Sequence, residues 1–172
     1  MLRRLVALAA VAAFTIPPVA QAQAKPKVVA ATPEEAGAYL LILGSCHDCH
    51  TPNWVESKGK VSKDSLMTGR ALGFKGPWGT NYAKNLRSIA ARQDENHWYK
   101  VMTTADGGEG NLPMPYHNTA LMNEEDIRNM YKYIKSLGTA TVERIPRGAK
   151  PGDEPNSTYL DLTVKTPAVK KP

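Results

Sequence analysis

The sequence contains few of the residues on which metal and redox chemistry depend, with two cysteines and four histidines among 172 residues. Beyond its N-terminal segment it has no apolar run of the roughly 17–25 residues that cross a bilayer. Its formal net charge of +6 is mild and is not gathered into basic clusters, which argues against a nucleic-acid-binding protein. It also lacks internal repeats and a catalytic constellation. We therefore expect one modest domain that is not itself an enzyme.

The N-terminus has the organisation of a secretory signal peptide. Arg3 and Arg4 precede an apolar run over Leu5–Ile16, which is too short for a membrane anchor. Small residues then offer cleavage after Ala22 or Ala24. We expect residues 1–22 to be removed on export to the periplasm.

Three later segments are predicted to be helices. After a flexible lead-in over residues 23–31, Thr32 caps the first helix, with proline at the first helical position and Gly44 at the end. The second runs over residues 94–104. The third begins after Asn123 and ends at Gly138. Their predicted apolar stripes are Ala36, Tyr39, Leu40 and Leu43; Trp98, Val101, Met102 and Ala105; and Ile127, Met130, Tyr131, Ile134 and Leu137.

The remaining segments are predicted to be irregular. Residues 51–85 contain repeated glycines, which favour a long loop of the kind that wraps a prosthetic group. A glycine-rich hinge is expected over residues 107–110. The proline-rich tail over residues 139–172 should contain no further helix, although residues 159–162 could dock as a short extended piece.

Both cysteines belong to one motif, Cys46-His47-Asp48-Cys49-His50. This C-x-x-C-H pattern is typical of covalent haem attachment. Thiols three positions apart lie about one helical turn apart, so both can reach the vinyl groups on one haem edge, and His50 can then ligate the iron. The same thiols could hold zinc or perform dithiol redox chemistry. A disulfide between them would close a very small loop and add little stability.

These features together resemble a class I c-type cytochrome over residues 32–138. The resemblance implies an all-α cytochrome c fold, with helices packed around one covalent haem and long wrapping loops between them. It also implies that the first and last helices cross, with Gly37 against Tyr131 or Tyr133. Asn85-Leu86 with Trp98, and the run from Leu112 to Tyr116, are similar to the cytochrome c subunits of periplasmic dehydrogenases. Those subunits usually continue with Thr-Pro-Asp or Thr-Pro-Glu, where this chain has Arg87-Ser88-Ile89.

The resemblance implies two axial ligands to the iron, His50 and a distal methionine. Met114 is the candidate, because flanking prolines restrict its loop and a thioether is a known haem ligand. His117 is the alternative. Met102 and Met130 lie on predicted apolar helix faces and are better interpreted as core.

Other chemistry-bearing residues are given simpler interpretations. His47 is expected to face solvent, and His97 to be a plain surface residue. Trp54, Phe74, Trp78 and Trp98 are expected to pack around the haem. Lysines at 58, 60, 63, 75 and 84 could form a solvated face or surround an exposed haem edge and meet an acidic redox partner.

We therefore expect a periplasmic one-electron carrier with one haem c, held by Cys46 and Cys49 and ligated by His50 and Met114. Its partners would be redox proteins such as a dehydrogenase or a terminal oxidase or reductase. One alternative is an obligate cytochrome subunit of a periplasmic dehydrogenase. Another is a haem enzyme or gas sensor with an open iron site.

Overall fold

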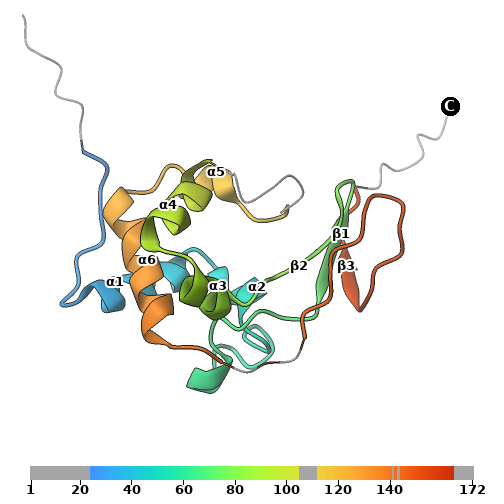
Figure 1. Ribbon diagram of the computed structural model, residues 1–172, viewed down its shortest axis with the longest axis horizontal. Coiled ribbons are helices and arrows are strands. Elements are labelled where there is room, and N and C mark those ends of the chain that lie inside the picture. The colour runs from blue at the N-terminus through green and yellow to red at the C-terminus, as the bar shows by residue number, and fades with distance from the viewer. Residues whose placement is uncertain (1–23, 105–111, 141, 143, 165–172) are drawn as a thin grey trace, which may run out of the picture.

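The computed structural model describes residues 24–104, 112–140, 142 and 144–164 (Figure 1). The predicted signal peptide over residues 1–22, the predicted hinge over residues 107–110 and the last eight residues of the tail lie outside this description. The helical elements are α1 (Pro33–Leu43), α2 (Cys46–His50), the 3-10 helix η1 (Lys63–Ser65), α3 (Leu86–Arg92), α4 (Glu95–Thr104), α5 (Tyr116–Thr119) and α6 (Glu124–Ser136). The strands are β1 (Gly73–Gly76), β2 (Gly79–Tyr82) and β3 (Tyr159–Asp161).

Helix α1 begins as predicted, because the Thr32 side chain accepts a hydrogen bond from the Glu35 amide over 3.1 Å. Only two of the four residues in its predicted apolar stripe are buried. Ala36 and Leu40 are buried, but Tyr39 and Leu43 are 53% and 59% exposed. The helix instead turns its Gly37 and Leu41 side to the core, because the glycine allows a close approach to α6.

Helix α6 confirms its predicted cap and stripe. The Asn123 side chain accepts from the Glu125 amide over 2.9 Å, and Gly138 follows the helix at a positive φ of 71°, which favours glycine. The helix crosses α1 at Gly37, where an added Cβ would lie 2.1 Å from the Asn129 carbonyl oxygen and 2.9 Å from the Tyr133 Cβ. The implied crossing is therefore present. The stripe residues Ile127, Met130, Tyr131, Ile134 and Leu137 are all buried.

Helices α3 and α4 both pack against α6. Helix α4 confirms the helix predicted over residues 94–104, and the Asp94 carboxylate at its start accepts from the His97 amide over 2.7 Å. The buried Trp98 Nε1 donates to the Ile127 carbonyl over 3.1 Å, which joins α4 to α6. Helix α3 was not predicted. It is capped by Asn85, whose side chain accepts from the Ser88 amide over 2.9 Å.

The predicted all-α fold is wrong, because the structure contains a three-stranded mixed sheet of order β2-β1-β3. Strand β1 pairs antiparallel with β2 and parallel with β3. Figure 1 shows this sheet to one side of the helices. The β1–β2 hairpin lies within residues 51–85, which were predicted to be a loop. Its glycines have low strand propensity, so no strand was predicted there. The expectation that residues 159–162 dock in extended form is confirmed, since they provide β3 and a bond from the Leu162 amide to the Lys75 carbonyl.

Among the described residues, no helix has both the length and the apolar character needed to cross a membrane.

Candidate functional site

A cavity of about 830 Å³ lies between the helices and the β1–β2 hairpin. Its volume is within the range of about 300–1,000 Å³ that is usual for ligand sites. The six α-helices α1 to α6 contribute to its lining, and so do both strands of the hairpin. The wall includes the apolar side chains of Leu41, Phe74, Leu86, Ile89, Trp98 and Val101.

Helix α2 places Cys46, Cys49 and His50 together in the wall of this cavity. The chain turns sharply between α1 and α2, with Ser45 at a positive φ of 53°. Two bonds then fix the short helix from outside: the Gly69 amide donates to the His50 carbonyl over 2.8 Å, and the Arg70 guanidinium donates to the Asp48 carbonyl over 3.1 Å. The predicted attachment motif is thus presented as one rigid group.

The imidazole of His50 is oriented by a backbone contact. Its Nδ1 lies 2.8 Å from the Lys84 carbonyl oxygen, and because a carbonyl can only accept, Nδ1 carries the hydrogen. Nε2 therefore keeps its lone pair, as in a metal-ligating histidine with an oriented second nitrogen. Burial lowers the pKa of His50, which favours the same neutral form.

The two thiols are held in their neutral form. Burial raises the pKa of Cys46 to about 11, and the neighbouring Cys49 adds to the rise. Burial, followed by the charge of Asp48, also raises the pKa of Cys49. Redox-active C-x-x-C motifs have lowered thiol pKa values.

In the described ranges, no group of three or more His, Cys, Asp or Glu residues could hold a metal ion, whereas structural zinc takes four ligands.

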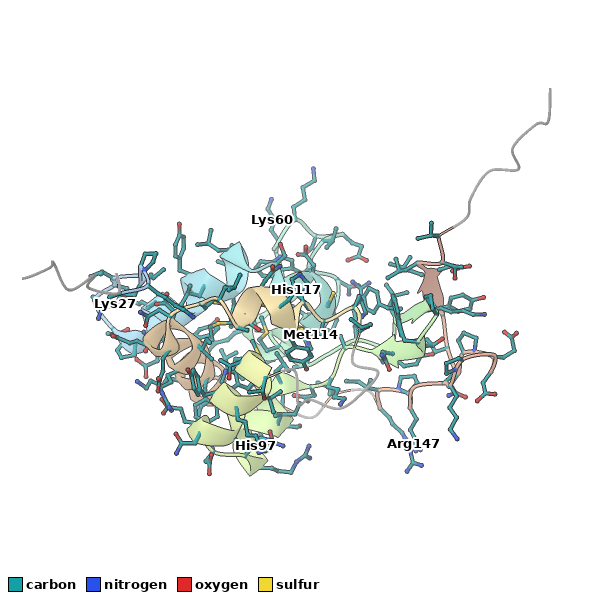
Figure 2. All side chains as sticks on the ribbon, turned by 90° about the horizontal axis from the view of Figure 1, so that it is seen from above. Lys27, Lys60, His97, Met114, His117 and Arg147 are labelled. Atoms are coloured by element: carbon teal, nitrogen blue, oxygen red, sulfur yellow. The ribbon has the colours of Figure 1, made fainter. Side chains whose placement is uncertain are left out.

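Met114 lines the same cavity as His50, although the two residues are far apart in sequence. Figure 2 shows Met114 near the middle of the molecule, whereas Lys60, His97 and Arg147 lie at its periphery. The alternative ligand His117 is exposed and is not among the residues that line the cavity.

The other described methionines differ in whether they line the cavity. Met102 and Met130 are 3% and 2% exposed, as expected for core residues, although both also contact the cavity. Met122 is half-buried and lines it too. Met67 is fully buried in the core. The cavity therefore has a wall rich in thioethers, of which Met114 alone is framed by prolines.

The expectation that His47 faces solvent is wrong. His47 is 3% exposed and stacks on Trp54, with ring centroids 4.0 Å apart. Its Nδ1 lies 2.9 Å from the Thr51 hydroxyl oxygen, which also accepts from the Met67 amide over 3.0 Å. Burial lowers the pKa of His47 to about 4. His47 is thus a neutral packing group that is buried against Trp54.

Two of the four aromatic residues expected around a haem do line the cavity, namely Phe74 and Trp98. Trp54 instead supports His47, and the Trp78 ring lies over Gly76 at the hairpin turn. Exposed His97 also contributes to the lining.

Lys84 is the one member of the five-lysine set that lines the cavity. Lys75 instead places its Nζ 5.1 Å from the centre of the Tyr159 ring.

The contribution of Asn81, Tyr82 and Ala83 to the cavity was not predicted, because these residues lie in a segment that resembled a glycine-rich loop. The contribution of Ile89 was not predicted either, because helix α3 itself was not predicted.

No family model matches the chain, and the searches of curated proteins and of solved structures found no match either.

Proposed function

We propose that the protein is a monohaem c-type cytochrome that carries single electrons in the periplasm. The observation that carries this proposal is the convergence of four residues on one largely apolar cavity of about 830 Å³. Cys46 and Cys49 would hold the haem through thioethers, and His50 and Met114 would provide its axial ligands. The predicted leader over residues 1–22 supports export, which haem attachment of this type accompanies.

The haem would supply a one-electron ferric–ferrous couple. His50 provides a lone pair that the Lys84 carbonyl holds in one direction. Met114 provides a thioether, which would raise the reduction potential of a bound haem. The apolar wall would limit water at the iron and would disfavour the more highly charged ferric state. With His50 and Met114 both holding the iron, the chain would leave no position for substrate chemistry.

Covalent attachment tests this proposal directly. The protein is matured in a host with a haem-attachment system, denatured and extracted with acid acetone. Haem should stay with the wild-type chain, because thioether bonds survive denaturation. A variant with Cys46→Ala and Cys49→Ala should release it, whereas the exposed-residue control His117→Ala should behave as wild type. Extractable haem, or none at all, in the wild-type protein would contradict the proposal.

One observation favours the second candidate, an obligate cytochrome subunit of a dehydrogenase. On α1, Tyr39, Ile42 and Leu43 are 53%, 54% and 59% exposed, and Leu43 also lines the cavity. We call these three residues the α1 outer face. Helix α1 is apolar on both sides, which is unusual for a helix at a protein surface, and exposed apolar patches often mark interaction sites. The face ends three residues before Cys46, so a partner bound there would lie beside the haem edge that carries the thioether bonds.

A further inference from the structure

Asn81 joins the β1–β2 hairpin to the loop that carries Met114. Its side-chain Nδ2 donates a hydrogen bond to the Leu112 carbonyl oxygen over 2.7 Å. Because a carbonyl can only accept, the amide nitrogen must face Leu112. This bond links residues from the sheet and from the methionine loop that are separated by 31 positions in the sequence.

The strand that carries Asn81 is fixed on both of its edges. On one edge Asn81 pairs with Phe74 of β1. On the other, Thr80 exchanges two backbone bonds with Ala149, over 2.8 and 2.9 Å. An added Cβ at Gly148 would lie 3.2 Å from the Asn81 side-chain oxygen, so the tail also lies against this amide. Strand β1 and the tail therefore hold the donor between them, and a rigid donor constrains its acceptor better than a mobile one.

We infer that Asn81 is a positioning residue for Met114, which acts through the Leu112 carbonyl to keep the thioether on the iron. The inference rests on the proposed function. Leu112 lies two residues before Met114, across Pro113, whose ring restricts the backbone between them. Fixing the Leu112 carbonyl therefore limits the positions that Met114 can take. The sheet and the proline-rich tail thereby contribute to the ligation of the haem.

Competition with imidazole measures this effect on the ferric holoprotein, since imidazole binds when Met114 leaves the iron. Asn81→Ala removes the donor. We expect imidazole to bind roughly three- to tenfold more tightly than in wild type, the change that corresponds to one hydrogen bond. The thioether-to-iron charge-transfer absorption should weaken in parallel. Asn81→Gln, which keeps an amide donor, should restore values near those of the wild type.

Asn156→Ala is the matched control. Asn156 makes the same kind of bond, from its side-chain nitrogen to the Arg147 carbonyl over 3.0 Å, and neither residue lines the cavity. It should leave imidazole affinity unchanged. If Asn81→Ala fails to acquire haem during maturation, Asn81→Leu provides a donor-free side chain of similar size. Failure of both variants to acquire haem, while Asn156→Ala matures normally, would assign Asn81 a folding role and overturn the inference.

Failure of this inference and failure of the proposed function give different results. Wild-type protein without covalent haem would contradict the proposed function. Equal imidazole affinity in wild type and Met114→Ala would remove Met114 as the ligand. If Met114→Ala binds imidazole much more tightly than wild type while Asn81→Ala and Asn81→Leu match wild type, the proposed function stands and the inference about Asn81 is wrong.

Discussion

Arg87 donates its Nε hydrogen to the Gly138 carbonyl oxygen, 2.7 Å away, just beyond the end of α6. Its Nη2 also donates to the carbonyls of Leu137 and Thr139, and its Nη1 to the Asp64 carbonyl over 3.1 Å. The last carbonyls of a helix lack partners within the helix and carry partial negative charge. The buried guanidinium, 5% exposed, therefore joins α3 and η1 to the end of α6.

Removing this guanidinium should destabilise the fold. Arg87→Met keeps much of the apolar length but leaves the buried Leu137 carbonyl and several partly buried carbonyls without this donor, so we expect a loss of about 2–4 kcal/mol in the free energy of unfolding. Urea denaturation followed by circular dichroism measures it. Arg92→Met, at an exposed site in the same helix, is the control and should change stability by less than about 0.5 kcal/mol. Equal effects of the two substitutions would contradict the assigned role.

The helices that the sequence predicts are those with a side-chain cap and an apolar stripe. Thr32, Asp94 and Asn123 each accept a hydrogen bond from a backbone amide in the first turn of their helix. Such local contacts depend on residues a few positions apart, so they can be inferred from the sequence. The orientation of α1 about its axis could not, because it depends on the contact of Gly37 with α6.

The sheet and several site residues depend on contacts between distant segments. Strand β1 is short and begins and ends with glycine, and its parallel partner β3 comes from a proline-rich tail. Neither has the alternating apolar pattern by which strands are recognised. The role of Arg87 was hidden for the same reason, since its acceptors lie about 50 positions away. The grouping of Cys46, Cys49 and His50 could be predicted from their spacing, because these residues lie within five positions of one another.

The depressed pKa of His47 predicts that stability depends on pH. Its pKa falls from 6.5 to about 4 on folding, so between these values the unfolded chain binds more protons than the folded one. The free energy of unfolding should therefore fall as pH decreases from 6.5 to 4, with His47 contributing up to about 1.4 kcal/mol per pH unit. His47→Phe should flatten this part of the profile, as measured by urea denaturation at several pH values.

The control for that profile is His97→Phe, which changes an exposed histidine of α4. It should keep the wild-type slope. A slope that is the same in His47→Phe and in wild type would show that the stack of His47 on Trp54 does not exclude the charged form.

Substitution of Met114 should open one axial position. In Met114→Ala the charge-transfer absorption of the thioether should disappear, and carbon monoxide should bind the ferrous form readily. The reduction potential should fall by on the order of 0.1 V, because the axial ligand is a main determinant of haem potential. Met122→Ala, at another methionine that lines the cavity, is the matched control. If Met122→Ala shows these changes instead, or if His117→Ala does, the distal ligand must be reassigned.

Electron self-exchange between ferrous and ferric copies, measured by NMR line broadening, tests which surface passes electrons. Only Lys84 among the five lysines lines the cavity, whereas the α1 outer face leads directly to Cys46. We therefore expect Ile42→Ser to slow exchange by roughly three- to tenfold, through lost apolar contact, and Lys60→Ser to change it little.

The dependence of the self-exchange rate on salt distinguishes electron transfer through the lysines from transfer through the α1 outer face. Charges are screened beyond about 8 Å at physiological ionic strength, so an exchange rate controlled by lysines on two like-charged copies should rise with added salt. A rate controlled by the α1 outer face should depend only weakly on salt. A strong rise with salt, together with a normal rate in Ile42→Ser, would assign electron transfer to the lysines and remove the main support for the subunit candidate. A rate that depends only weakly on salt, together with slower exchange in Ile42→Ser, would favour that candidate. An apolar contact beside the thioether bonds suits a partner that stays bound.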